Sequence, residues 1–331
     1  MFESPAPARP RFLRDPWSTS YESAFQIEEA AEQPQEAPPV DLTVETAFWA
    51  PVAAPELPRP EAVVFVDGVQ NVDARLLAMH EGVHVNAALV SVAAGAFVAR
   101  PESPLIDPVR TARWLVVADA SLEVEPLEVP WGETSVTFRP HSYPGFGYQA
   151  VAQAIDSVRR DLETAVAAEM TARGFPLVVM DGRLRIFPGD LTSVVGYAKT
   201  LHTRYLPPAE WSTLAALPAR HRTPVFRIDQ SKPLYSWYLR LQEPWPADYA
   251  MAGIVRLETI AEMPAGQAAR LADLTASILP DFASRPWQDA RAPQNLLPLG
   301  ALEAGLRREL GDRASLQRAI GDYLHRLELT S

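Results

Sequence analysis

The stretch PLVVMDG, residues 176–182, decides the architecture of this chain. Its apolar run predicts a buried strand that ends at Asp181. In the preceding segment, residues 148–174, apolar side chains recur every three or four positions, which predicts an amphipathic helix. A long helix that leads into a buried strand is typical of a crossover into a parallel sheet.

A second apolar run ends on the same two residue types. AVVFVDGV, residues 62–69, leads into Asp67 and Gly68. Asp-Gly between apolar runs is a strong hairpin signal, and for either site taken singly a hairpin turn is the favoured interpretation. However, both aspartates end near-continuous apolar runs, where α/β proteins place their ligand sites. Since a lone buried charge is costly, each carboxylate is expected to bind a cation.

The remaining pattern predicts an α/β layered fold, with strands first, then helix–strand alternation, then helices. Further strands are predicted at residues 83–99, 110–129, 191–200, 235–242 and 252–260, and further helices at residues 265–279, 299–311 and 313–328.

Composition separates the N-terminal part from the rest. Residues 1–60 hold eleven of the 32 prolines and a net charge of −6 out of −11. They are predicted to form a Pro-rich acidic arm, partly disordered or docking, ahead of a globular domain at residues 61–331. The chain has no cysteine, which excludes disulfides and Cys-ligated zinc. With no apolar run long enough to span a membrane and no signal peptide, a cytoplasmic protein is expected.

A third carboxylate completes a candidate metal site. Glu163 lies beside the apolar stripe of the predicted helix and could reach the sheet edge. An exposed helix carboxylate is the alternative. An all-oxygen site built from Asp67, Glu163 and Asp181 suits Mg²⁺ or Mn²⁺ rather than zinc. Such sites support phosphodiester cleavage, often with two ions about 3.5–4 Å apart.

Basic and aromatic side chains follow the second aspartate. VVGYAKTLHTRYLP places Lys199, His202 and Arg204 just past a strand end, a local positive charge of the kind that phosphate binding needs. YSWYLRLQ adds Tyr238 and Arg240, and such aromatic side chains can stack on bases. The alternative is that the aromatic residues are core residues of a strand.

One motif indicates a different enzyme class. His80, Glu81 and His84 match H-E-x-x-H, the signature of zinc peptidases. The motif works on a helix, whereas the residues that follow it read as a strand. A chance match in a strand or loop is the favoured interpretation, and a zinc metallopeptidase is kept as an alternative function.

Seven motifs in order resemble the NurA nuclease family. They are FVDGVQ, the helix with RRDLE, VVMDGRL, VVGYAKTLHTRYLP, YSWYLRL, GIVRLE and DARAPQNLLPLGALEAGLRRELGD, and the last is similar to the bacterial branch. The resemblance implies an RNase H-like mixed sheet flanked by helices and a Mn²⁺- or Mg²⁺-dependent deoxyribonuclease. It also implies 5′→3′ exonuclease and single-strand endonuclease activity in DNA end resection and repair, on single- and double-stranded ends. The implied partners are a HerA-type hexameric ATPase and a second copy of the chain.

The resemblance also assigns roles to residues. Asp67, Glu163 and Asp181 match the family's metal-binding carboxylates, and Lys199 matches its basic residue. Archaeal relatives carry a histidine in the last motif that this chain lacks, so Gln294 or Asn295 is expected to line the site instead. A non-catalytic regulatory subunit of a motor ATPase is the alternative from another class, although intact Asp67 and Asp181 argue against it.

Overall fold

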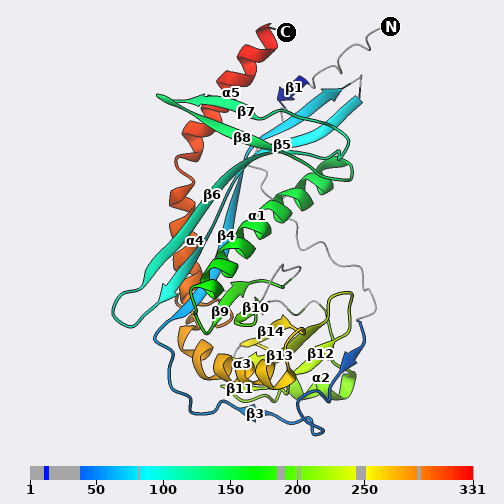
Figure 1. Cartoon of the computed structure of the whole chain (residues 1–331), viewed down its shortest axis with the longest axis vertical. Helices are drawn as coiled ribbons and strands as arrows, with labels where there is room; N and C mark the ends of the chain where they lie inside the picture. The colour runs from blue at the N-terminus through cyan, green and yellow to red at the C-terminus, as the bar shows by residue number, and fades with distance from the viewer. Residues whose placement is uncertain are drawn as a thin grey trace.

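The computed structural model describes residues 11–14, 38–80, 83–184, 191–199, 201, 203–243, 251–288 and 292–330 (Figure 1). The strands are β1 (Arg11–Arg14), β2 (Val40–Asp41), β3 (Val52–Ala53), β4 (Val63–His80), β5 (Val83–Ala99), β6 (Leu105–Val117), β7 (Leu127–Trp131), β8 (Thr134–Ser142), β9 (Val178–Asp181), β10 (Val194–Ala198), β11 (His221–Arg222), β12 (Phe226–Ile228), β13 (Leu234–Arg240) and β14 (Ile254–Ile260). The helices are α1 (Gly147–Ala172), α2 (Pro208–Leu214), α3 (Ala265–Ile278), the 3₁₀ helix η2 (Leu279–Phe282), α4 (Leu297–Glu309) and α5 (Arg313–Thr330).

These strands form one mixed sheet, whose central order is β10-β9-β4-β5-β6. β4, β9 and β10 run parallel, and β5 runs antiparallel to both β4 and β6. The crossover from β6 to β9 contains α1, as the sequence predicts. This is the strand order and direction of an RNase H-like core, so the expected mixed sheet flanked by helices is confirmed.

α1 covers one face of the sheet (Figure 1). Its apolar residues are buried from Ala150 to Met170, so its apolar stripe faces the sheet. Its C-terminal half packs Val166 and Met170 against Val66 and Met180, and its N-terminal half packs Ile155 on β5 and β6. This contact fixes α1 above the point where β9 ends.

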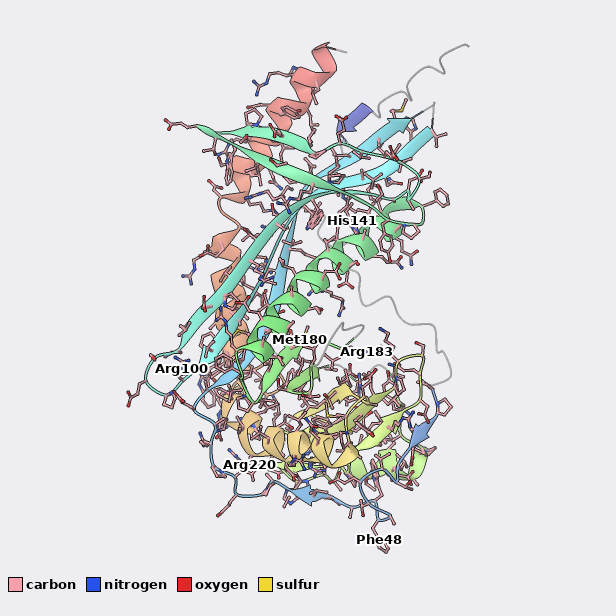
Figure 2. All side chains as sticks on the ribbon, viewed as in Figure 1. Phe48, Arg100, His141, Met180, Arg183 and Arg220 are labelled. Carbon is pink, nitrogen blue, oxygen red and sulfur yellow. The ribbon has the colours of Figure 1, made fainter. Side chains whose placement is uncertain are left out.

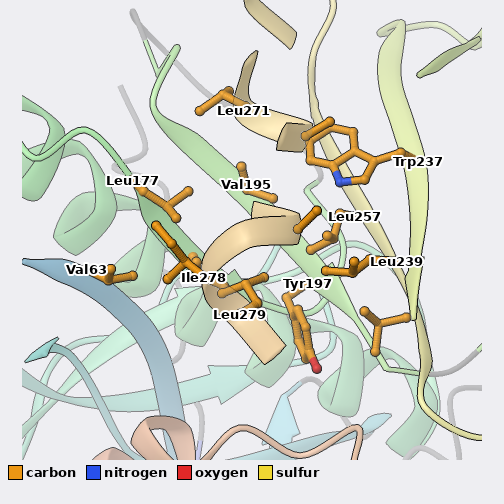
Figure 3. Packing of buried hydrophobic residues seen from close by; sticks show 14 of the residues in the cluster. Val63, Leu177, Val195, Tyr197, Trp237, Leu239, Leu257, Leu271, Ile278 and Leu279 are labelled. Atoms are coloured by element: carbon orange, nitrogen blue, oxygen red, sulfur yellow. The ribbon is translucent and has the colours of Figure 1, made fainter. Parts of the chain in front are cut away.

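The opposite face is covered by C-terminal helices. α3 and η2 pack on Phe65, Val179 and Trp237, which belong to the largest buried cluster. Figure 3 shows Trp237 of this cluster with Leu271 of α3 and Leu279 of η2. α4 packs on the middle of β4 and β5, and α5 packs on their far ends and on β7. No helix in the described ranges is long and apolar enough to cross a bilayer.

Part of the predicted arm lies against the body. β2 pairs with β12, and β3 pairs with β11. Between them, Glu45 accepts hydrogen bonds from Arg222 Nη1 at 2.9 Å, Arg222 Nη2 at 2.7 Å and the Val225 N–H at 2.6 Å. Residues 38–60 are therefore docked on the body, and the domain boundary at residue 60 stays a prediction.

A bulge in β4 buries an acidic side chain. Asp73 lies at the register shift between Val72 and Ala74 and is 3% exposed. Ser91 Oγ donates to Asp73 Oδ2 at 2.6 Å, while Oδ1 has no partner in the described part of the chain. Burial raises the pKa of Asp73 to about 6, although Ser91 and nearby arginines lower it.

We therefore expect Asp73 to make the stability depend on pH. Between about pH 4, its ordinary pKa, and about pH 6, the folded state binds more protons than the unfolded state. The free energy of unfolding should fall as pH rises through this window, by on the order of 3 kcal/mol. Urea unfolding at pH 4.5 and pH 7.5 should show about two thirds of this fall in the wild type and a smaller one in Asp73→Asn. Asp322→Asn, at an exposed position on α5, is the control, and an equal fall in all three proteins would contradict the prediction.

Candidate active site

Asp67 and Asp181 lie side by side on neighbouring parallel strands. The register pairs Val66 with Met180, so the next residue on each strand is an aspartate. Adjacent strands are about 4.8 Å apart, and laterally paired residues share a face. The sheet thus brings together two carboxylates that are more than a hundred residues apart in the sequence.

The first Asp-Gly pair does not end its strand, contrary to the prediction. β4 continues past Gly68 as far as His80. The glycine is needed for a different reason, which is the close approach of α1. A methyl group at Gly68 would lie 2.5 Å from Glu163 Oε1 and 3.1 Å from Arg159 Cγ. Because Gly68 has no side chain, Glu163 can pack against the backbone of β4, where it is 2% exposed.

The second Asp-Gly pair does turn the chain. Gly182 has a φ of +89°, which glycine adopts at little cost, and its N–H donates to the Tyr197 carbonyl at 2.9 Å. The chain then crosses over Gly196 on β10, and the Leu184 N–H donates to Glu258 Oε1 at 2.6 Å. Because β10 runs parallel to β9, this turn is not a hairpin between them.

Two of the three carboxylates are paired with cations of the chain itself. Lys199 Nζ lies 2.8 Å from Asp181 Oδ2. Arg159 forms an ion pair with Glu163 and donates from Nε to Gln70 Oε1 at 3.2 Å. Asp67 Oδ1 accepts the N–H of Gly68 at 2.7 Å.

Burial and neighbouring carboxylates raise the pKa of Asp67 and that of Glu163. Burial raises the pKa of Asp67 well above its usual range, and the charges of Asp181 and Glu163 raise it further, while Lys199 lowers it. Burial also raises the pKa of Glu163, which Arg159 and Arg160 lower in part. Negative charge is therefore crowded at this point, and an additional cation would relieve the repulsion.

The donor set suits a hard divalent cation in its chemistry, since it consists of carboxylate oxygens only. No group of three or more acidic or histidine side chains in the described part of the chain has the geometry to hold a metal ion. Instead, Lys199 and Arg159 contact two of the proposed ligands. Binding of Mn²⁺ or Mg²⁺ by Asp67, Glu163 and Asp181 therefore stays a prediction.

Of the predicted basic residues, Lys199 lies at the site and Arg204 does not. Arg204 is exposed and lies over the Trp211 ring, with Cζ 5.4 Å from its centroid. His202 lies outside the described residues.

Tyr238 and Arg240 do not fit the expected contact with DNA. Tyr238 is fully buried, and its ring stacks on Phe226 with centroids 5.9 Å apart. Arg240 is 1% exposed and donates to the carbonyls of Ala252 at 2.6 Å and Ala215 at 3.0 Å. Both are core residues, because β13 lies between β12 and β14 and is buried at every position.

Gln294 and Asn295, which are expected to line the site in place of the archaeal histidine, lie near it because Tyr197 contacts Gln294. Tyr197 is paired with Asp181 across β9 and β10, and its hydroxyl donates to the Gln294 carbonyl at 2.6 Å. Asn295 is 6% exposed, and its carbonyl accepts the Ser284 N–H. Tyr197 therefore links the backbone of Gln294 to the strand next to Asp181. That Gln294 or Asn295 lines the site stays a prediction.

The zinc motif lies on a hairpin rather than on a helix. His80 ends β4 and pairs with Val83, and Met79 pairs with His84 on β5. Glu81 lies outside the described residues. The zinc peptidase signature requires both histidines on one face of a helix, whereas here they lie on two antiparallel strands, so the zinc peptidase interpretation does not meet its structural requirement.

Sequence reasoning missed the arginines that accompany the carboxylates. Arg159 and Arg160 belong to the RRDLE motif, but their place at the site depends on how α1 rotates above β9. A signal was available, because Arg159 precedes Glu163 by one helical turn and such pairs form ion pairs.

No family model matches the chain, and no curated protein matches it. Among solved structures, it is similar to the NurA nuclease from Sulfolobus solfataricus, with a TM-score of 0.49 and 12% sequence identity. The similarity covers 94% of this chain and 98% of that one. A likeness this weak carries no weight for function, so the site stands on its own residues.

Proposed function

We propose that this chain is a metal-dependent DNA nuclease. The observation that carries the proposal is that Asp67 and Asp181 lie side by side where β9 ends, with Glu163 close enough to raise the pKa of Asp67 and with Lys199 paired to Asp181. Hydrolysis of a phosphodiester requires cations and an activated water. Carboxylates that lie close together can bind the cations, and a neighbouring lysine can bind the phosphate. The ordered motifs that resemble the NurA nucleases support the same function.

Each residue of the site has a role in this proposal. Asp67 and Asp181 would hold Mn²⁺ or Mg²⁺, as a pair of ions, from neighbouring strands, and Glu163 would complete the ligand set from α1. When bound, such ions would supply an activated water and stabilise the leaving oxygen. Lys199 holds a phosphate oxygen next to Asp181, and Arg204 contacts the DNA backbone further out. Gly68 leaves room for Glu163 between α1 and β4.

The finer parts of the proposal come from the resemblance alone. They are the bacterial branch of the family, 5′→3′ exonuclease and single-strand endonuclease activity on single- and double-stranded DNA ends, end resection with a HerA-type ATPase, homodimerisation and cytoplasmic location. A shift in elution volume on mixing with such an ATPase would test the partnership.

Cleavage of end-labelled single-stranded DNA tests the proposal directly. We expect cleavage with Mn²⁺ or Mg²⁺, none with chelator, and none from Asp181→Ala under any condition. His84→Ala is the control, because an exposed strand histidine should not matter to this site. Absence of cleavage by the wild type, with and without an added HerA-type ATPase, would leave a non-catalytic subunit of a motor ATPase as the better interpretation.

A further inference from the structure

Two consecutive arginines on α1 share one carboxylate. Asp156 Oδ1 accepts from Arg159 Nη2 at 2.7 Å, and Asp156 Oδ2 accepts from Arg160 Nε at 2.7 Å. The two guanidinium groups then diverge. Arg159 turns to Glu163 and Gln70, inside the structure.

Arg160 instead faces the turn that follows Asp181. A methyl group on Gly182 would lie 3.9 Å from Arg160 Nη1. The guanidinium therefore lies next to Gly182, which has no side chain. The side chain of Arg160 is 25% exposed, and among the described residues only Asp156, at Nε, is bonded to it. Its two terminal nitrogens therefore remain available to a ligand.

Two other basic side chains border the same turn. Lys199, which directly follows β10, contacts Asp181, and Arg183 follows Gly182 and donates to the Tyr205 hydroxyl at 2.9 Å. Figure 2 shows Arg183 below α1, on the side toward Met180. Arg160 from α1 and Lys199 from the end of β10 thus lie at the Asp181–Gly182 turn, and Arg183 follows that turn in the chain.

We propose that Arg160, held by Asp156, binds a non-bridging phosphate oxygen of a single-stranded DNA backbone at the Asp181–Gly182 turn. The inference rests on the proposed nuclease function and adds a substrate contact to it. A planar guanidinium whose Nε is fixed by a carboxylate presents its remaining N–H groups in one direction, which suits a phosphate. Asp156 is the positioning residue, and the absence of a side chain at Gly182 keeps the approach open.

Binding in chelator tests the contact without any need for cleavage. Fluorescence anisotropy of a labelled oligothymidylate should show about tenfold weaker binding by Arg160→Gln at moderate salt, and the slope of log K against log salt should fall by about 0.7. Arg160→Lys keeps the charge but loses the planar fork, so its affinity should be intermediate. The control is Arg173→Gln at the far end of α1, which removes the same charge from a 41% exposed side chain paired with Asp107.

Asp156→Asn separates positioning from net charge. This substitution makes the protein more positive, so a purely electrostatic surface predicts tighter binding, whereas the positioning role predicts weaker binding. Tighter or unchanged binding by Asp156→Asn would overturn the positioning role.

Equal binding by Arg160→Gln and Arg173→Gln would overturn the contact, even if the wild type cleaves DNA. A selective loss of binding by Arg160→Gln in a protein that shows no cleavage would keep the contact and remove the nuclease function. A wild type that does not bind the oligonucleotide at all would overturn the inference.

Discussion

Replacing Gly68 with alanine is expected to reduce DNA cleavage by at least about 100-fold and the free energy of unfolding by about 1–3 kcal/mol. The added methyl group would lie 2.5 Å from Glu163 Oε1 and 3.0 Å from Glu163 Cγ. Glu163 is buried and paired with Arg159, so neither can move without disturbing the other. The strand itself tolerates alanine, because Gly68 is not among the glycines with positive φ.

Cleavage rates and urea unfolding of Gly68→Ala measure both effects. Gly300→Ala is the matched control, since a methyl group there meets nothing within 4 Å and lies on α4. It should leave cleavage unchanged and stabilise the protein by about 0.5–1 kcal/mol. Adding Glu163→Asp to Gly68→Ala shortens the displaced side chain and should restore part of the stability. A fully active, fully stable Gly68→Ala would show that α1 does not press Glu163 onto β4.

The sequence was sufficient to predict the sheet's centre. A helix with a clear apolar stripe that leads into a buried strand predicted α1 and β9. The residues alone did not predict which strand β9 pairs with; the structure shows its parallel pairing with β4, which places Asp67 beside Asp181. The prediction worked because both features depend on local periodicity and on one crossover, which few topologies can satisfy.

Other features depend on packing between distant segments and could not be predicted. β4 continues beyond Gly68 through polar residues and a bulge at Asp73, where the alternation of apolar residues is lost. Tyr238 and Arg240 looked available to a ligand, but β13 is a central strand covered on both faces. A polar side chain on such a strand is as consistent with a buried hydrogen-bond network as with a binding site.

Replacing Asp67 with asparagine is expected to abolish cleavage, by at least about 1,000-fold, while it raises the free energy of unfolding. The gain should be about 1–2 kcal/mol near neutral pH, because the substitution removes a carboxylate that is crowded by two others. Burial, Asp181 and Glu163 all raise the pKa of Asp67, so keeping it ionised costs folding free energy that asparagine does not cost. The amide can still accept the Gly68 N–H.

Opposite changes in activity and stability would distinguish a functional site from a structural one. A carboxylate kept for structure would be stabilising, and its removal would lower both quantities. Unfolding is therefore measured in chelator, where no added cation offsets the repulsion, and again with Mn²⁺. We expect Asp67→Asn to be more stable than the wild type in chelator and to lose that advantage with Mn²⁺. Asp229→Asn, at an exposed position next to β12, should change stability by less than about 0.5 kcal/mol in both conditions. If Asp67→Asn is instead less stable in chelator, Lys199 and the Gly68 N–H outweigh the repulsion, and the crowding of charge no longer supports a cation site.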